Sequence, residues 1–491
     1  MVERSRLGSG RSALQRVIVI RTYDIIVIGS GPAGQRAAIQ AAKCGRRVAV
    51  IEAREIIGGV CLNTGTIPSK TMREAVLHLS GFQYQGIYGI NYTVKDKITM
   101  YDLGFRVNQV IKTEAAVTQN QMTRNSVDLI HGTASFLDPT HIRVESVNGQ
   151  TDLEAANIIL ATGTKPAVSP EVPINGRNII NSDQILDMKE IPRTLIVVGG
   201  GVIGVEYACM FAVLGVRVVL VERRPRLLEF ADAEIIEALS YHLREKRVTL
   251  RLNEEVASVA ESNGGVVANL KSNKRISGDA LLYAVGRQGN VDGLKLENAG
   301  LQADYRGRIN VNEEFRTAVP SIFAVGDLIG FPSLASVAME QGRQAASHAL
   351  GLRVVSRPEN YPYGIYTIPE ISFIGKTEEQ LTEDDVPYEV GMAYYRETAR
   401  GQIRGDTSGR LKIIFHRETR QILGVHIIGE GAAELLHIGQ AVMVLKGTID
   451  YFVETVFNYP TLAECYKQAA FNGVNRLRGE AAPPDSSCAS A

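Results

Sequence analysis

Short apolar runs alternate with longer amphipathic segments through the first two thirds of the chain. The apolar run Tyr23–Gly29 has the length of a strand, the alanine-rich segment that follows it to Lys43 has a helical composition, and Arg47–Ile51 is a second apolar run. Strands that alternate with helices in this way predict a mostly parallel sheet with helices packed on it. The first unit of the chain is therefore expected to have an α/β fold.

The same order of elements returns later in the chain. Thr194–Val198 is an apolar strand, a helix is expected from Val205 to about Leu214, and Arg217–Val221 is the next strand. This internal duplication predicts two domains of one type. A helical pattern from about Asp102 to Asn125 is interpreted as a scaffold helix of the first unit. Further strands are expected at Val127–Phe136, His141–Val147, Asn157–Leu160, Asp279–Val285 and Thr317–Asp327, and a further helix at Leu334–Ala349.

The pattern changes from about residue 358. Apolar strands are expected at Ile371–Ile374, Leu411–Phe415 and Ile422–Ile428, and helices begin near Glu434 and Leu462. A run of strands followed by helices indicates a separate α+β domain. The predicted fold is thus two α/β units followed by an α+β domain.

Glycines at the first turn between strand and helix carry a chemical signal. Gly29, Gly31 and Gly34 follow the first strand in the spacing GxGxxG, and Glu52 ends the second strand. The first glycine permits a tight turn, the second lets the backbone approach a pyrophosphate, and the third lets helix and strand pack closely. The helix N-terminus attracts phosphate, and the acid suits ribose hydroxyls. This unit is therefore expected to bind a dinucleotide.

The second unit repeats this signature with one difference. Its glycines are Gly199, Gly201 and Gly204. Its second strand ends in Glu222, and Arg223 and Arg224 follow. An acid suits the free 2′-hydroxyl of NAD, whereas arginines suit the 2′-phosphate of NADP. The segment therefore offers a site for both nucleotides, and a plain solvent-exposed role for each arginine is the alternative.

The amino-acid composition restricts the kinds of partner that the chain is expected to bind. The 491-residue chain is several domains long, and its 53 acidic residues balance its 53 Lys and Arg. This balance gives no reason to expect nucleic acid or an anionic membrane as partner, and no apolar run is long enough for a membrane span. The five cysteines are scattered without a CxxC pair, so neither a disulfide framework nor a metal site is indicated. Residues 1–22 are interpreted as an N-terminal extension, with a transit peptide as the alternative, and residues 479–491 as a disordered tail.

The stretch GGVCLNTGTIPSK, from Gly58 to Lys70, lies just downstream of the first glycine signature. Together with both glycine signatures, the ATG that ends at Gly163, the acid Glu206 and the run TAVPSIFAVGD, it resembles the flavoprotein disulfide reductase superfamily. The resemblance covers about residues 23–478, with the motifs in family order. Within that superfamily, GTIPSK and the late segment FNYPTLAE are similar to those of the soluble, Si-specific NAD(P)+ transhydrogenases, a class-I pyridine nucleotide-disulfide oxidoreductase family.

The resemblance implies an arrangement of domains and partners. It implies an FAD-binding domain in two parts, residues 23–170 and 286–356, an NAD(P)-binding domain at 171–285, and a C-terminal α+β dimerisation domain at 357–478. The two nucleotide-binding domains would be Rossmann-like. The resemblance further implies FAD as cofactor, NAD(H) and NADP(H) as substrates, a homodimer or a higher homo-oligomer, and a cytoplasmic enzyme.

The resemblance also assigns site residues. Lys70 would lie near flavin N5 and pair with Glu206, and these two are the expected catalytic residues. Asp327 would bind the flavin ribitol, the helix starting near Leu334 and Ala335 would point at the flavin N1/C2=O edge, and Arg287 would approach the pyrophosphate. The other residues expected to hold FAD or a nucleotide are Gly29, Gly31, Gly34, Glu52, Ala53, Gly58, Gly59, Cys61, Thr66, Ala134, Thr162, Gly163, Gly199, Gly201, Gly204, Glu222, Arg223, Arg224, Gly286 and Gly326.

Two positions depart from the superfamily. Cys61 keeps the first cysteine of the usual redox disulfide, but Thr66 stands at the second. Tyr459 replaces the histidine of a late His-Pro-Thr motif, while Glu464 is kept. A phenol with a pKa of about 10 is a poorer general base than an imidazole with a pKa of about 6.5. Hydride exchange between two nicotinamides needs neither a disulfide nor that base. The expected function is therefore reversible transhydrogenation by a ping-pong route through flavin N5.

Alternatives stay open at this stage. The chain could be an oxidoreductase similar to dihydrolipoamide dehydrogenase or mercuric reductase, an NADH oxidase that uses Cys61 as a sulfenic acid, or a flavin-bearing assembly component without turnover. Cys61 is interpreted as a packing residue, with a redox-sensitive thiol that faces the flavin as the alternative. Tyr459 and Glu464 have an alternative as packing residues of an interface.

Overall fold

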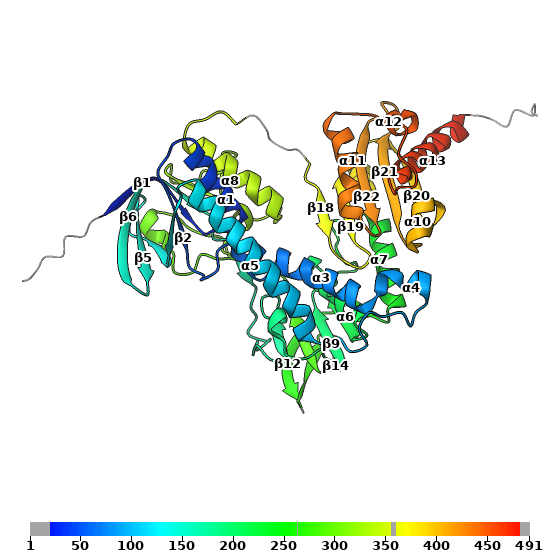
Figure 1. The fold of residues 1–491 in the computed structure, drawn as a ribbon, viewed down its shortest axis with the longest axis horizontal. Coiled ribbons are helices and arrows are strands. Elements are labelled where there is room, and N and C mark those ends of the chain that lie inside the picture. Colours follow the sequence, from blue (N-terminus) through cyan, green and yellow to red (C-terminus); the bar gives the residue numbers. More distant parts are fainter. Residues whose placement is uncertain (1–19, 263, 355–359, 482–491) are drawn as a thin grey trace, which may run out of the picture.

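The computed structural model describes residues 20–262, 264–354 and 360–481. Figure 1 shows three units: a first sheet with β1, β2, β5 and β6, a second unit with β9, β12 and β14, and a third with β18–β22, while helices α3 and α5 run between them. The two α/β units and the C-terminal α+β unit agree with the fold class predicted from the sequence.

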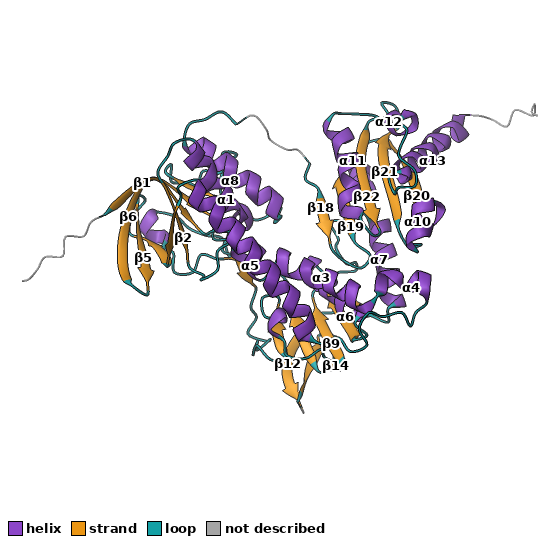
Figure 2. Cartoon of the chain, in the orientation of Figure 1, coloured by secondary structure: helices purple, strands orange, loops and turns teal. Residues whose placement is uncertain are grey.

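The first unit is built on a sheet with the strand order β3-β2-β1-β6-β5-β4, and β17 pairs with β6. Its strands are β1 (Arg21–Ile28), β2 (Val48–Glu52), β3 (Asp128–His131), β4 (Thr133–Phe136), β5 (His141–Ser146), β6 (Gly149–Leu160) and β17 (Ile322–Ala324). The central strand β1 is parallel to β2 and β6. Helix α1 (Pro32–Lys43) packs against α8 (Ala335–Ala349) (Figure 2). Helices α1 and α8, which are about 300 residues apart in the sequence, therefore belong to one unit.

The second unit has a fully parallel sheet in the order β11-β10-β9-β15-β8. Its strands are β8 (Ile179–Asn181), β9 (Thr194–Val198), β10 (Arg217–Glu222), β11 (Thr249–Leu252) and β15 (Ala280–Tyr283), and its helices are α6 (Val202–Val213) and α7 (Ala233–Glu245). An antiparallel meander of β12 (Val256–Ser262), β13 (Gly265–Leu270) and β14 (Arg275–Gly278) is added to it. The chain passes between the two units through the antiparallel pair β7 (Thr164–Pro166) and β16 (Arg287–Gly289).

The third unit is an antiparallel sheet in the order β18-β19-β22-β21-β20 with helices around it. Its strands are β18 (Tyr363–Ile365), β19 (Ile371–Gly375), β20 (Tyr388–Tyr394), β21 (Arg410–His416) and β22 (Ile422–Ile428). Its helices are α9 (Glu378–Glu383), α10 (Ala399–Arg404), α11 (Ala432–Val444), α12 (Asp450–Glu454) and α13 (Glu464–Ala481).

The remaining elements join the units. They are α2 (Gly59–Asn63), α3 (Thr66–Ser80), α4 (Phe82–Tyr88), α5 (Met100–Arg124) and the short 3₁₀ helices η1 (Ile185–Asp187), η2 (Leu296–Ala299), η3 (Gly326–Ile329) and η4 (Tyr395–Glu397). Helix α5 begins two residues before the expected helix, because Thr99 and Asp102 form a reciprocal cap at its N-terminus.

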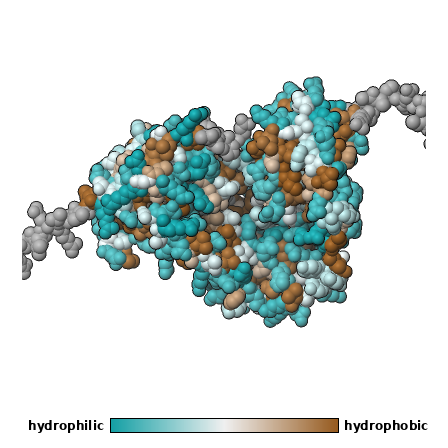
Figure 3. All heavy atoms as spheres, turned by 45° about the horizontal axis from the view of Figure 1, so that its top comes forward, coloured by the Kyte–Doolittle hydropathy of each residue, from teal (hydrophilic) through white to brown (hydrophobic). Residues whose placement is uncertain are grey.

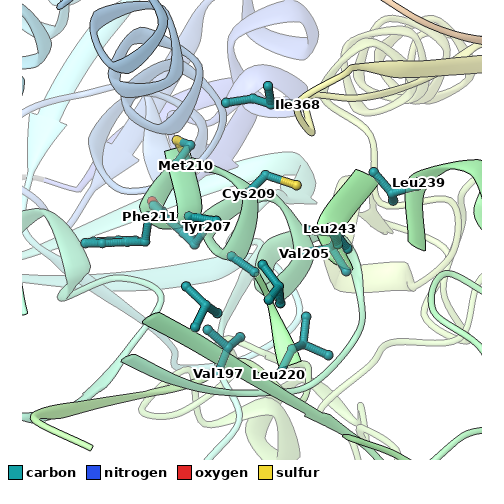
Figure 4. Packing of buried hydrophobic residues seen from close by; sticks show 14 of the residues in the cluster. Val197, Val205, Tyr207, Cys209, Met210, Phe211, Leu220, Leu239, Leu243 and Ile368 are labelled. Carbon is teal, nitrogen blue, oxygen red and sulfur yellow. The ribbon is translucent and has the colours of Figure 1, made fainter. Parts of the chain in front are cut away.

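A shared hydrophobic core joins α3, and α6 of the second unit, to the third unit. Met72 and Val76 of α3, the buried face of α6, and Ile365, Ile368 and Ile371 of the third unit belong to one cluster. Figure 4 shows Cys209 and Met210 of α6 on the side that faces Ile368. Since buried apolar area is the main source of folding free energy, this cluster fixes α3 against α6 and against the loop that follows β18.

Several boundaries differ from the sequence prediction: for example, α6 begins at Val202 instead of Val205, and β17 covers only Ile322–Ala324 of the expected strand Thr317–Asp327. The expected strand Val127–Phe136 is divided into β3 and β4 at Gly132, where a β-carbon would collide with Glu145 of β5. Helix α13 continues to Ala481, past the predicted start of the tail at residue 479, and the rest of that tail lies outside the described residues. Arg21 already belongs to β1, while residues 1–19 of the expected extension lie outside the described part.

The surface combines polar and apolar areas. Figure 3 shows patches of hydrophobic residues among mostly hydrophilic ones. On the third unit, Val444, Leu445, Val456 and Tyr459 are exposed, Val456 at 89%. In the described ranges, no helix combines the length and apolar character that crossing a membrane requires.

Candidate active site

A deep cavity lies at the carboxyl end of the first sheet. Of the residues expected to hold FAD, its wall includes Gly29, Gly31, Glu52, Ala53, Gly59, Cys61, Thr66, Ala134, Thr162, Gly163, Gly326, Asp327 and Ala335. These residues come mainly from the first glycine turn, the stretch from Gly58 to Lys70, the exit of β6, the turn after β17 and the start of α8. The fold therefore brings residues that are far apart in the sequence, and that were predicted to hold FAD, together along one cavity.

The three glycines of the first turn play different steric roles. A β-carbon on Gly29 would collide with the carbonyl of Ala161, and one on Gly34 would collide with the carbonyl of Gly29. A β-carbon on Gly31 would meet nothing within 4 Å, because this residue faces the cavity. Gly29 and Gly34 are thus required for packing, whereas Gly31 leaves space for a ligand at the N-terminus of α1.

Glu52 is held for a ligand by its own turn. Its Oε2 accepts hydrogen bonds from the Ser30 backbone nitrogen at 2.9 Å and from Ser30 Oγ at 2.6 Å, and its Oε1 accepts from the Arg54 nitrogen at 2.8 Å. Ser30 Oγ also accepts from the backbone nitrogen of Gly58 at 2.8 Å. Ser30 therefore connects Glu52 to the stretch from Gly58 to Lys70, a link that the sequence reasoning missed.

The opposite wall of the cavity is formed by η3 and α8. Gln341 Oε1 accepts a hydrogen bond of 2.8 Å from the Gly326 nitrogen and fixes the turn that presents Asp327. Burial raises the pKa of Asp327, while Arg287 and a hydrogen bond from Thr164 oppose the rise. Ser333 and Ala335 bring the start of α8, with its positive dipole end, to the wall. Leu334 caps α8 and is not part of the wall.

The cavity fits the dinucleotide flavin that the resemblance implies. Gly31 leaves open space at a helix N-terminus for a pyrophosphate, and Glu52 is held where ribose hydroxyls would lie. The hydroxyl oxygen of Thr162, on the cavity wall, is buried and has no hydrogen-bond partner among the described residues. An orphaned buried hydroxyl is costly unless a ligand satisfies it. These features suit a bound polar ligand along the whole cavity.

Lys70 of the joining helix α3 and Glu206 of the second unit form an ion pair. Lys70 Nζ lies 2.8 Å from Glu206 Oε1 and 2.7 Å from Oε2, and the Glu206 side chain is only 4% exposed. Glu206 Oε1 also accepts a hydrogen bond of 2.8 Å from the backbone nitrogen of Tyr366. The Lys70 ammonium lies 5.0 Å from the centroid of the Tyr366 ring. The expected pair is therefore present, and Tyr366 is a neighbour that no sequence motif marked.

Cys61 and Thr66 lie together on the cavity wall. Burial raises the pKa of the Cys61 thiol above its ordinary value, and a hydrogen bond with the Thr66 side chain opposes the rise. The four cysteines of the described residues, Cys44, Cys61, Cys209 and Cys465, are all free thiols. Cys61 is therefore protonated at neutral pH, as suits a packing residue more than a nucleophile.

The second glycine turn repeats the first. β-Carbons on Gly199 and Gly204 would collide with the carbonyls of Ala284 and Gly199, whereas one on Gly201 would meet nothing within 4 Å. Glu222 Oε2 accepts a hydrogen bond of 2.6 Å from the Gly200 nitrogen. The second unit thus offers the same open N-terminus, at α6, and the same anchored acid. Gly286, which follows β15, has a φ of 147°.

The arginines after Glu222 differ in their contacts. Arg224 Nε lies 3.3 Å from Glu222 Oε1, and its NH1 lies 3.6 Å from Glu229 Oε2. Arg226 NH1 lies 3.2 Å from Glu379 in α9 of the third unit. Arg223 is exposed, and no ion pair of its side chain is found within the described residues. Arg223 is therefore free for a ligand, Arg224 is shared with two acids, and Arg226 is committed to another unit.

Other predicted residues have protein partners instead of cavity contacts. Arg287 donates to Thr164 Oγ1 at 2.9 Å and pairs with Asp183 at 2.9 Å, and it is not on the cavity wall. Gly34, Gly58 and Lys70 are also not on that wall. Tyr459 is 68% exposed on the third unit. The sequence reasoning also missed several wall residues, namely Arg54, Thr133, Lys165, Asn290 and Asp292, because no glycine signature or family motif marks them.

Comparison with protein families matches most of the chain. Residues 23–342 match the family described as "Pyridine nucleotide-disulphide oxidoreductase", and residues 361–470 match the dimerisation domain of that family. These two matches confirm the predicted fold class of nucleotide-binding domains plus a C-terminal dimerisation domain.

Individual proteins are also similar. The chain is 51% identical to the soluble pyridine nucleotide transhydrogenase of Mycobacterium tuberculosis (strain ATCC 25177 / H37Ra), over 94% of this chain and 98% of that protein. It is 47% identical to the protein of that name from Hahella chejuensis, over 93% of this chain and 99% of that protein. Among solved structures, LpdA from Mycobacterium tuberculosis matches with a TM-score of 0.84 and 28% identity, over 92% of this chain and 99% of that chain. The flavoprotein disulfide reductase RclA from Escherichia coli matches with a TM-score of 0.82 and 28% identity, over 91% of this chain and 99% of that chain.

Proposed function

Because the chain belongs to the pyridine nucleotide-disulphide oxidoreductase family, and is therefore an oxidoreductase, we propose that it is an FAD-dependent pyridine nucleotide transhydrogenase. It transfers hydride reversibly between NADPH/NADP+ and NADH/NAD+. The similarity to curated soluble transhydrogenases over nearly the whole chain supports this activity. The motif resemblance noted in the sequence leads to the same activity.

The observation that carries the proposal is the thiol site. A disulfide reductase passes electrons through two neighbouring cysteines, and here Thr66 faces Cys61 on the cavity wall. Burial keeps the Cys61 thiol protonated at neutral pH, so it is a weak nucleophile. Within the part of the chain that the structure describes, electrons that enter the cavity therefore have no pair of neighbouring thiols to leave by, and a second nicotinamide is the natural acceptor. We infer that the reaction proceeds without a redox-active disulfide.

FAD, when bound in the cavity, supplies the group that accepts hydride from one nicotinamide and returns it to another. Gly31, Glu52, Thr162, Asp327 and the start of α8 would hold it. The Lys70–Glu206 pair, whose carboxylate is buried, would place a fixed ammonium beside the reacting ring. A positioned positive charge that does not need to reorganise favours a transition state in which negative charge develops. Protein groups thus supply position and field, and no side chain has to transfer a proton to a substrate.

One nicotinamide nucleotide site serves both substrates in this proposal. Gly201 leaves space for the pyrophosphate at the start of α6, and Glu222 accepts the ribose hydroxyls of NAD(H). Arg223 and Arg224 hold the 2′-phosphate of NADP(H), and Arg224 leaves its two acids to do so. The two nucleotides bind in turn, which gives a ping-pong order.

We also propose the domain roles and the assembly. Residues 23–170 and 286–356 bind FAD, residues 171–285 bind the nicotinamide nucleotide, and residues 357–478 mediate dimerisation. The dimerisation-domain match supports a homodimer. The relatives are named soluble transhydrogenases, and we propose a cytoplasmic location for this enzyme.

The experiment is an anaerobic transfer assay. The purified, FAD-loaded protein is mixed with NADPH and thio-NAD+, and formation of reduced thio-NAD is followed by its absorbance. Catalytic turnover is expected without lipoamide, glutathione disulfide, mercuric ion or oxygen. Turnover that appears only with a disulfide, with mercuric ion or with oxygen would contradict the proposal, and so would a flavin that NADPH cannot bleach.

A further inference from the structure

The joining helix α3, the second unit and the third unit meet at the Lys70 ammonium. Lys70 lies on α3, Glu206 lies on α6 of the second unit, and Tyr366 follows β18 of the third unit. Both carboxylate oxygens of Glu206 contact Lys70 Nζ, and the Tyr366 ring lies 5.0 Å from the same nitrogen. The ammonium is therefore held between a carboxylate and an aromatic ring.

The loop that carries Tyr366 is fixed on both sides. The Tyr366 backbone nitrogen donates to Glu206 Oε1 at 2.8 Å, and the carbonyl of Thr367 accepts from Arg73 Nε at 3.0 Å. Arg73 lies on α3, one helical turn after Lys70, and its side chain is 3% exposed. Ile365 and Ile368, on either side of these two residues, are buried in the core shared by the units. The loop therefore cannot move independently of α3 and α6.

Gly364 lies against the Tyr366 ring. A β-carbon on Gly364 would lie 3.3 Å from Cε2 of the ring, so the glycine leaves just the space that the ring fills. No hydrogen bond of the Tyr366 hydroxyl to another described residue is found. The ring face, and not the hydroxyl, is thus the part of this side chain that the structure places on Lys70.

An aromatic face attracts a cation through the ring quadrupole, with an effect that grows as the pair is removed from water. A lysine has a flexible four-carbon stem, so its ammonium needs such partners to keep one position. The Lys70 side chain is 25% exposed, whereas that of Glu206 is 4% exposed. The Lys70 side chain is thus less enclosed than its carboxylate partner, and the ring gives its ammonium a second contact.

We propose that Tyr366 is a positioning residue for the reaction: its ring holds the Lys70 ammonium in the place where Lys70 acts on the bound flavin. The dimerisation unit thereby contributes a side chain to the active site of its own chain. This inference rests on the proposed role of Lys70.

The first test compares Tyr366→Leu with Tyr366→Phe. A phenyl ring keeps the face and a leucine removes it. The rate constant for flavin reduction by saturating NADPH, measured by stopped-flow absorbance, is expected to fall about three- to thirty-fold in Tyr366→Leu. It is expected to stay within about two-fold of wild type in Tyr366→Phe, and the NADPH concentration at half saturation should change little in both. Tyr366→Met, which has a similar volume but no ring, should behave as Tyr366→Leu and serves if the leucine variant does not fold.

The second test does not depend on activity. The apoprotein is treated with trinitrobenzenesulfonate, and the rate at which Lys70 is modified is read by peptide mass spectrometry. Loss of the ring frees the ammonium, so modification of Lys70 should be faster by about three-fold or more in Tyr366→Leu and unchanged in Tyr366→Phe. Tyr363→Leu is the matched control, because Tyr363 lies in the same segment but its ring stacks on Phe373. It should leave Lys70 modification unchanged.

The outcomes are distinct. Equal Lys70 modification in wild type and Tyr366→Leu, or equal loss of flavin reduction in the Leu, Met and Phe variants, would overturn the inference. Absence of hydride transfer to thio-NAD+ with unchanged Lys70 protection would instead refute the transhydrogenase proposal and leave the position of Lys70 supported. Thermal midpoints and FAD content should match wild type in the variants that are compared.

Discussion

The arginines at the end of β10 provide the sharpest test of nucleotide recognition. We expect the double variant Arg223→Ala/Arg224→Ala to lose NADPH while it keeps NADH. Arg223 is exposed and Arg224 is 43% exposed at its side chain, so each contact with a 2′-phosphate belongs at the lower end of the range for charged hydrogen bonds, about 1.5 kcal/mol. Two such contacts amount to about 3 kcal/mol, or roughly a hundred-fold in affinity.

Competition within the protein reduces this figure. Arg224 must leave Glu222, at 3.3 Å, and Glu229, at 3.6 Å, before it can pair with a phosphate. We therefore expect the KM for NADPH to rise roughly thirty- to a hundred-fold. The KM for NADH should change by less than about three-fold, because Glu222 keeps its bond from the Gly200 nitrogen.

The assay is steady-state transhydrogenation in both directions, with KM determined separately for each nucleotide. Arg226→Ala is the matched control: it removes the same side chain from the same segment, but Arg226 already pairs with Glu379 at 3.2 Å. That variant should leave the ratio of the two KM values within about three-fold of wild type. Equal increases in KM for NADPH and NADH in the double variant would refute the assignment of this segment to the 2′-phosphate.

Three further predictions follow from buried groups and glycines. Cys61→Ser should keep more than about half of the activity. Because burial raises the pKa of the Cys61 thiol, iodoacetamide should alkylate Cys61 at neutral pH far more slowly than it alkylates the exposed Cys44. Fast labelling of Cys61 or an inactive serine variant would contradict this. Burial raises the pKa of Glu370, which directly precedes β19, from 4.5 to about 7, so the free energy of unfolding should fall by up to about 3 kcal/mol as the pH rises through that interval. Glu370→Gln should therefore raise the thermal midpoint more at about pH 8 than at about pH 5, and an equal effect at both pH values would exclude the shift. Gly31→Ala should give a folded protein that retains little FAD, whereas Gly34→Ala should unfold at a lower temperature even without FAD. The reverse pattern in thermal scans and flavin content would refute the steric roles of these two glycines.

Much of the fold could be predicted because its signals are local. The apolar run of β1, the glycines at 29, 31 and 34, and the acid at the end of β2 are close in sequence, and each has a backbone reason to be there. The second unit repeats the same short pattern. The ion pair of Lys70 with Glu206 was expected only from the family resemblance, and the structure bears out its geometry.

The parts that could not be predicted depend on contacts between distant segments. Tyr366 reaches Lys70 only because the third unit packs on α3, and nothing in its local sequence indicates that partner. Arg226 closely follows Arg223 and Arg224 in the sequence, but its partner Glu379 lies in another unit. The strands β12 and β14 alternate between exposed and partly buried positions along most of their length, so they gave no apolar run to find.

The central claim is that electrons enter and leave the protein only as hydride on nicotinamides. An anaerobic titration of the FAD-loaded enzyme with NADPH tests it most directly. We predict that one equivalent of NADPH per FAD bleaches the flavin completely, that a second equivalent is not consumed, and that NAD+ then restores the oxidised spectrum. Uptake of a second equivalent, as an additional redox-active thiol pair would cause, or a reduced flavin that NAD+ leaves bleached, would contradict the account.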